Sequence, residues 1–207
     1  MYLYFVICAL TLGIVFAQEV ASVKKVVMII AQDGFRDEEL LQPKGILERA
    51  GIEVKVASTS LNVAGGMLGA KVKPDMVIND IDIKDFDAII FVGGIGASQY
   101  WDDPLAHKLA QDAINSNRIV GAICIAPVTL AKAGILTGIR ATVFSSEVGQ
   151  LKAAGANYTA RDVEKDGNII TSGLFKLSQV LNSNEIEKNI RELLLKRKQT
   201  QPIEFPN

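Results

Sequence analysis

Short runs of consecutive apolar residues recur along the chain and alternate with stretches of helical periodicity. Residues 26–30, 88–92 and 118–123 are almost wholly aliphatic, as is typical of strands buried on both faces. Between and after these strands, helices are predicted at residues 37–50, 125–133, 147–154 and 184–198. A further helix is predicted to begin at residue 102. This alternation predicts a single doubly wound α/β domain, in which helices cover both faces of a mostly parallel sheet.

Weaker patterns complete the predicted domain. Residues 53–57 are predicted as the second strand, and further strands are expected at 140–144, 158–163 and 168–171. A hairpin-like excursion is expected over residues 63–78, which contain three glycines and a proline. The domain should therefore span residues 24–198, with 199–207 as a C-terminal tail.

The first 17 residues differ from the rest of the chain. Residues 2–17 carry no charged side chain and only one hydroxyl outside the tyrosines, that of Thr11, and they end in Ala17 before a polar Gln-Glu pair. This segment is shorter than the roughly 20 apolar residues of a membrane span, so we predict a cleaved signal peptide and export to a periplasm or medium. Because Lys24 and Lys25 follow the segment, an uncleaved membrane anchor is the alternative.

Composition narrows the range of partners. Hydrophobic residues make up 49% of the 207-residue chain and aromatic residues 6%, which predicts an aliphatic core. The formal net charge is −1, and acidic and basic residues are interspersed. Phosphate binding needs clustered Lys and Arg, so nucleic acid is not expected as a partner. The basic run at 196–198 is interpreted as the solvated end of a helix.

Cys124 is the candidate for chemistry. Cys8 lies in the N-terminal segment and would leave with it, so the mature chain would hold one thiol and no internal disulfide. Cys124 lies between a predicted strand and a predicted helix, with Ala122 and Ala126 two positions away on either side. Small flanking residues suit a tight nucleophile elbow, and a helix start favours the thiolate. The alternative is a buried, inert cysteine, and the local sequence does not decide between the two.

Two further segments should lie at the same edge of the sheet. Gly93-Gly94 follows a predicted strand, where backbone N–H groups can face a ligand as an oxyanion hole, although an ordinary turn is the commoner explanation of such a pair. Residues 34–39 follow the first strand and contain three acids, which either approach the thiol or simply suit the helix dipole. Ligands bind beyond the carboxyl ends of such strands.

The order of four segments resembles the ThiJ/PfpI family of the class I glutamine-amidotransferase-like superfamily, with its flavodoxin-like fold. The segments are residues 33–40, 86–94, 122–127 and 166–172. The resemblance implies that Cys124 is the reactive elbow cysteine. It also implies that Glu39, four residues before Pro43, is the acid whose protonated carboxyl hydrogen-bonds the sulfur, with Glu38 ranked second.

The same resemblance assigns the remaining site groups and the range of functions. The backbone at Gly93, Gly94 and Ile125 would supply N–H groups to an oxyanion. Family members include glyoxalases or deglycases, proteases, chaperones and oxidative-stress sensors; they usually form dimers or larger homo-oligomers, and most are cytoplasmic. No cofactor or metal ion is expected, because one cysteine and one distant histidine do not make a zinc site.

The chain departs from the family pattern at histidine. Ile125 follows the cysteine, and Phe144 occupies a later position, where family members have histidines. His107 is the only histidine of the chain, and it is predicted to be a solvated helix residue that could reach a site only across a subunit interface. General base catalysis at neutral pH usually relies on histidine, so a peptidase or amidohydrolase is disfavoured.

The leading expectation is therefore a cysteine-dependent enzyme acting on small reactive carbonyl compounds or their adducts. Cys124 would be its nucleophile and Glu39 its proton donor. The alternative is a noncatalytic oxidative-stress sensor or chaperone that uses oxidation of Cys124.

Overall fold

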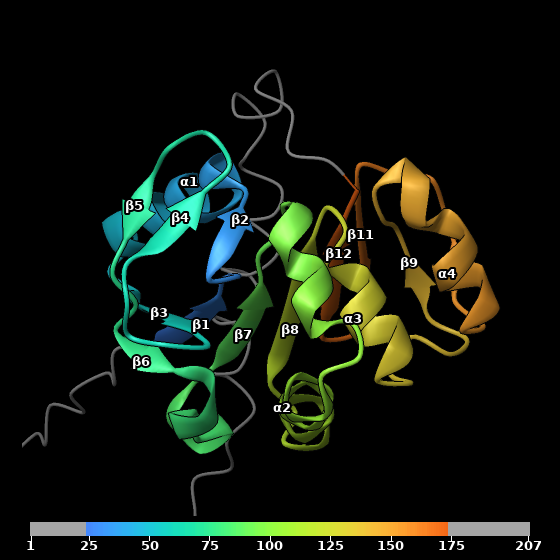
Figure 1. Ribbon diagram of the computed structural model, residues 1–207. Coiled ribbons are helices and arrows are strands. Elements are labelled where there is room, and N and C mark those ends of the chain that lie inside the picture. The colour runs from blue at the N-terminus through green and yellow to red at the C-terminus, as the bar shows by residue number, and fades with distance from the viewer. Residues whose placement is uncertain (1–23, 174–207) are drawn as a thin grey trace, which may run out of the picture.

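The computed structural model describes residues 24–173, which include a seven-stranded sheet. Helices flank this sheet (Figure 1). The strand order is β11-β12-β8-β7-β1-β3-β6, and every neighbouring pair is parallel except β11 with β12. The strands are β1 (Lys25–Ile29), β3 (Glu53–Ser58), β6 (Met76–Val77), β7 (Ala88–Phe91), β8 (Ile119–Ile123), β11 (Val163–Asp166) and β12 (Ile169–Ser172). The predicted doubly wound, mostly parallel fold is confirmed.

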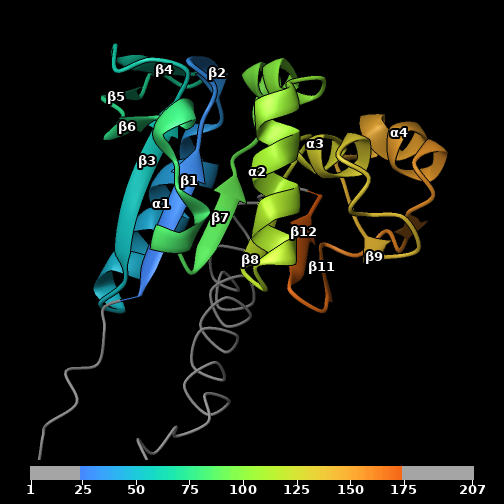
Figure 2. The ribbon, with the colours of Figure 1, turned by 90° about the horizontal axis from the view of Figure 1, so that it is seen from below.

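Helices cover the two faces of the sheet (Figure 2). The α-helices are α1 (Asp37–Arg49), α2 (Pro104–Asn115), α3 (Pro127–Lys132) and α4 (Val148–Ala153). Short 3₁₀ segments are η1 (Ile78–Asp80), η2 (Ile83–Asp85), η3 (Ile95–Tyr100) and η4 (Ser145–Glu147). Alternate residues of β1 enter two separate cores: Val27 joins the cluster that includes α2 and α3, whereas Val26 joins the cluster beneath α1.

Local chemistry explains where the helices begin. The Asp103 carboxylate accepts hydrogen bonds from the backbone N–H of Leu105 at 2.8 Å and of Ala106 at 3.4 Å, and Pro104 is the first residue of α2. The start of α2 agrees with the helix predicted from residue 102. The helix α1 also begins at Asp37 as predicted, and it accommodates Pro43 in its interior.

The predicted excursion over residues 63–78 forms a small second sheet. The strands β4 (Ala64–Gly66) and β5 (Lys71–Val72) pair as an antiparallel hairpin, and β4 pairs in parallel with β2 (Asp33–Phe35). The start of the 34–39 segment is therefore part of the short strand β2. The buried Asp37 carboxylate fixes the tip of this hairpin, because it accepts hydrogen bonds from Leu68 N at 2.9 Å and Ala70 N at 2.7 Å.

Two predicted elements are shorter than expected. The strand predicted at 140–144 is only β9 (Arg140–Ala141), which pairs with β10 (Asn157–Tyr158) outside the main sheet. The amides after β9 are used elsewhere, since Thr142 N donates to the Thr171 hydroxyl and Phe144 N donates to Cys124 O. The helix predicted from residue 125 begins only at Pro127.

Several predictions fall outside the described residues. These are the signal peptide over 1–17, the helix over 184–198 and the tail over 199–207, which stay predictions. Within residues 24–173, none of the helices has the length and apolar character needed to cross a membrane.

Candidate active site

Cys124 lies in the turn between β8 and α3, as the elbow interpretation predicted. Its φ angle is 62°, in the left-handed region that non-glycine residues seldom adopt. The surrounding backbone holds this conformation, because Cys124 N donates to Ser172 O and Cys124 O accepts from Phe144 N, both at 2.8 Å. The thiol is half-buried and lines a cavity, so it is neither sealed in the core nor fully exposed.

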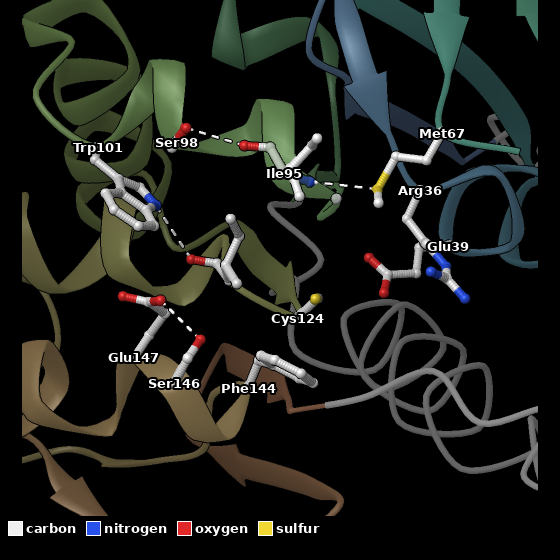
Figure 3. A pocket seen from close by; sticks show the side chains of 12 residues that line it. Arg36, Glu39, Met67, Ile95, Ser98, Trp101, Cys124, Phe144, Ser146 and Glu147 are labelled. Carbon is white, nitrogen blue, oxygen red and sulfur yellow. Dashed lines mark hydrogen bonds between the residues drawn. The ribbon is translucent and has the colours of Figure 1, made fainter.

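Glu39, in the first turn of α1, provides the acid that faces this thiol (Figure 3). Its side chain is 2% exposed, and its Oε2 accepts a hydrogen bond from Gly93 N at 3.0 Å. Burial raises the pKa of Glu39 to about 7, against the lowering effect of the hydrogen bonds with Gly93 and the Cys124 thiol. At neutral pH the buried carboxyl is therefore able both to donate and to accept a proton.

Glu38, the second-ranked acid, has a different partner. Its carboxylate binds the Arg36 guanidinium in a bidentate pair, with N–O distances of 2.9 and 3.2 Å. Glu39 is therefore the buried acid that contacts the sulfur, whereas Glu38 compensates the charge of Arg36.

The electrostatics of Cys124 differ from the sequence-based expectation. Burial and the facing Glu39 carboxylate raise the pKa of the thiol to about 11, although the backbone N–H groups of Gly94 and Ile125 act on the sulfur to lower it. The prediction that the helix start favours the thiolate is wrong, because burial and the Glu39 carboxylate outweigh the N–H groups that lower the pKa of the thiol, and α3 begins only at Pro127. A reaction at this sulfur would require the thiol proton to leave, and Glu39 is the adjacent group able to take it.

The two glycines after β7 have separate roles. Gly93 donates its N–H to Glu39, so it holds the acid in place and does not serve the oxyanion site to which it was assigned. The N–H groups of Gly94 and Ile125 interact with the sulfur, as expected for groups that would stabilise an oxyanion formed beside it. Gly94 has a φ of 96° and packs against the backbone of residues 34–36.

The close packing at Gly93 gives a testable prediction. A Cβ at this position would lie 2.5 Å from Cys124 Cβ and closer still to Glu39 Oε2. Gly93→Ala is therefore expected to lower the free energy of unfolding by about 2 kcal/mol, as overpacking does, and to lower the activity because the acid and the thiol separate. Urea unfolding measures the first effect.

The matched control for this prediction is Gly149→Ala. Gly149 lies in α4, where an added Cβ would meet nothing within 4 Å, and alanine favours a helix. Equal stability of the two variants would contradict the close packing inferred between Gly93, Glu39 and Cys124.

Around the thiol lies a cavity of about 530 Å³. Its lining residues are Arg36, Glu39, Met67, Gly94, Ile95, Ser98, Trp101, Cys124, Ile125, Phe144, Ser146 and Glu147. Met67, on the β4–β5 hairpin, lies against the residue that follows Gly94, because its Sδ accepts a hydrogen bond from Ile95 N at 3.4 Å. The cavity therefore joins residues from separate parts of the chain over a wall that is largely apolar.

Histidine is absent from this cavity lining. His107 is half-buried on α2, and its Nε2 lies 2.7 Å from Trp101 O, so the prediction of a solvated residue is wrong. Trp101 in turn donates its indole N–H to Ile125 O at 3.3 Å. Phe144 lines the cavity as an apolar residue. In the part of the chain that the structure describes, no group of three or more His, Cys, Asp or Glu side chains is placed to hold a metal ion.

Sequence reasoning missed several members of the cavity. Met67, Trp101 and Glu147 reach it from segments that no local pattern connects to Cys124. Trp101 is the single tryptophan of the chain, immediately before a strong helix start, which is the one signal that could have drawn attention to it.

Comparison with known proteins shows the family of this chain. The family model described as the DJ-1/PfpI family matches residues 24–184. The chain belongs to the DJ-1/PfpI family. This membership confirms the resemblance to ThiJ/PfpI proteins drawn from the four segments, and it fits the flavodoxin-like fold.

Curated relatives cover most of the domain. An uncharacterized protein of Methanocaldococcus jannaschii is 44% identical over 72% of this chain and 74% of its own length. A deglycase of Pyrococcus abyssi is 31% identical over 70% of this chain and 88% of its own. A glutathione-independent glyoxalase of Caenorhabditis elegans is 28% identical over 73% of this chain and 81% of its own.

A solved structure shows the same architecture. The ThiJ/PfpI domain protein from Brachyspira murdochii matches with a TM-score of 0.78 and 30% identity, over 84% of this chain and 98% of the other.

Proposed function

We propose that this protein is a cysteine-dependent enzyme that converts small reactive carbonyl compounds, or their adducts, into hydroxy acids. The observation that carries the proposal is the buried Glu39 carboxyl facing the Cys124 sulfur at the floor of a cavity. Deglycase and glyoxalase relatives support the same class of activity. The small cavity suits substrates such as methylglyoxal.

The first step is addition of the thiol to the aldehyde carbon. The S–C bond forms while the thiol proton passes to the Glu39 carboxylate, and the N–H groups of Gly94 and Ile125 stabilise the developing oxyanion. Protonation of this oxygen gives a hemithioacetal. An adduct on nitrogen enters the same path when its C–N bond breaks and the leaving nitrogen takes a proton from Glu39.

The remaining steps relocate two hydrogens and add one water. The Glu39 carboxylate removes the hydrogen of the sulfur-bearing carbon as the neighbouring carbonyl oxygen gains a proton, which gives an enediol. Glu39 then returns its proton to the neighbouring carbon, and the hydroxyl of the sulfur-bearing carbon loses its proton, which converts the hemithioacetal into a thioester. Water then cleaves the S–C bond and releases the hydroxy acid and the thiol. Methylglyoxal plus water gives lactate, so one carbon is oxidised as its neighbour is reduced and no external oxidant is needed.

A redox-sensing role for Cys124 is the second candidate. The raised pKa of the thiol slows a direct attack at neutral pH, and the same N–H groups of Gly94 and Ile125 would stabilise an oxidised sulfur. A peptidase has less support, because an amide carbonyl is much less electrophilic than an aldehyde and the described cavity offers no histidine to activate the thiol for attack on it.

The proposal predicts that the purified protein converts methylglyoxal into lactate without glutathione or added metal. Lactate formation, followed by a coupled assay, measures this conversion. Stoichiometric oxidation of Cys124 by peroxide, together with no lactate formation, would contradict the enzyme and favour the sensor.

A further inference from the structure

We propose that Trp101 is a positioning residue of the Cys124 site, whose indole N–H holds Ile125 so that the backbone N–H of Ile125 faces the sulfur. This inference rests on the proposed function, because the Ile125 N–H is one of the two groups assigned to the developing oxyanion. Trp101 lies outside the four segments that carry the family resemblance.

The two backbone N–H groups that face the sulfur come from separate segments of the chain. Gly94 immediately precedes η3, whereas Ile125 follows Cys124 in the turn before α3. Trp101 follows η3 directly, and its Nε1–H donates a hydrogen bond to Ile125 O at 3.3 Å (Figure 3). The indole therefore connects the segment that carries the first N–H group to the residue that carries the second.

Ile125 needs this restraint because it follows a strained residue. The φ angle of 62° at Cys124 belongs to a conformation that persists only where the surrounding contacts fix it. Ile125 O also accepts a hydrogen bond from Val128 N at 3.2 Å, and a carbonyl oxygen has lone pairs for both donors. The bond from Val128 lies within the elbow itself, so the bond from Trp101 is the one that fixes Ile125 from outside it.

Trp101 is itself held by two neighbouring helices. Its backbone O lies 2.7 Å from His107 Nε2 of α2, and this nitrogen carries the hydrogen because a carbonyl oxygen only accepts. Lys132 Nζ of α3 lies 5.8 Å from the centre of the indole ring, and both oxygens of Asp102 bind this ammonium at 2.9 Å. These contacts restrict the orientation of the indole, so its N–H is in place before a substrate binds.

The role assigned to Trp101 belongs to its donor group and not to its size. The indole also lines the cavity, so removing the whole side chain would change the cavity as well as the bond to Ile125 O. A decisive variant therefore removes the N–H and keeps the ring. Such a change leaves Arg36, Glu39 and Glu147, the charged residues of the cavity lining, as they are.

Trp101→benzothienylalanine makes this change, because a sulfur atom replaces the indole N–H in a ring of the same shape. The first readout is the rate at which iodoacetamide alkylates Cys124, followed by mass spectrometry of the Cys124 peptide, and it needs no turnover. The thiolate is the reacting form, and the Ile125 N–H lowers the pKa of this thiol. At about pH 8 the rate is expected to fall about threefold, because this N–H loses its alignment with the sulfur.

Tyr100→Phe is the matched control on the neighbouring residue. It also removes one aromatic donor to a backbone carbonyl, because Tyr100 Oη donates to Ile30 O at 2.9 Å. That oxygen keeps the hydrogen bond from Ser58 Oγ, so both variants leave the acceptor with one partner. The alkylation rate of Tyr100→Phe should equal that of the wild type. An unchanged rate in the Trp101 variant, or an equal fall in both variants, would overturn the positioning role.

A second readout connects Trp101 to turnover. In Trp101→benzothienylalanine the kcat for methylglyoxal is expected to fall about fivefold while KM changes less than about twofold, because the oxyanion forms only in the reaction and the ring still lines the cavity. A rise in KM with kcat unchanged would overturn the positioning role and leave Trp101 as a wall of the cavity. If the wild type does not turn over methylglyoxal while alkylation still slows in the Trp101 variant, the proposed function fails and the control of the sulfur by Trp101 stands.

Discussion

Cys124→Ser is expected to lower the turnover of methylglyoxal by at least about 1,000-fold, because every bond-forming step passes through this sulfur. A serine hydroxyl is a far weaker nucleophile, and the site contains no histidine to activate it. The substitution replaces sulfur by the smaller oxygen at a half-buried position, so the fold should persist. Lactate formation measures the loss, and circular dichroism with thermal unfolding verifies the fold.

Cys8→Ser is the control for this variant, since Cys8 is the only other cysteine of the chain. It should retain the activity of the wild type. If Cys124→Ser is as active as the wild type, the mechanism through the thiol is contradicted.

Glu39→Gln is expected to lower the activity about 100-fold and, above neutral pH, to make the protein more stable. The loss of activity follows because an amide cannot accept the thiol proton. The stability follows from the raised pKa of Glu39, about 7 in the folded protein against an ordinary value of 4.5. The folded state binds this proton more tightly, so the free energy of unfolding falls as pH rises from about 4.5 through 7.

The size of this effect follows from the two pKa values. By pH 8, ionisation of the buried Glu39 carboxyl lowers the free energy of unfolding by about 3 kcal/mol. Glutamine does not ionise, so Glu39→Gln removes this pH dependence. Urea unfolding of the wild type and Glu39→Gln at about pH 5 and about pH 8 measures it. Glu38→Gln is the control, and an equal loss of activity in that variant would contradict the distinction drawn between the two acids.

The main elements of the fold could be predicted because they depend on local patterns. The aliphatic runs that form β1, β7 and β8 are buried on both faces, and the acidic cap with Pro104 specifies the start of α2. The residues after β9 were mispredicted because their backbone bonds to distant groups, the Thr171 hydroxyl and Cys124 O, which no local pattern shows.

The candidate site was predictable only in part. The segment around Cys124 indicated an elbow, and the resemblance to known proteins distinguished Glu39 from Glu38. The pKa of the thiol was mispredicted, because it depends on how much water the folded chain removes and on a carboxylate from another element. Trp101 and Glu147 were missed for the same reason, since only the tertiary fold brings them into the cavity.

The central claim is that Glu39 and Cys124 act as one proton-sharing pair. The most direct test is the pH dependence of kcat/KM for methylglyoxal in the wild type and in Glu39→Gln. The wild-type value should rise as Glu39 loses its proton at about pH 7, because the carboxylate must accept the thiol proton. Glu39→Gln should lack this rise near pH 7 and gain activity only as the thiol itself ionises at higher pH. A rise near pH 7 that is identical in both proteins would contradict the pair.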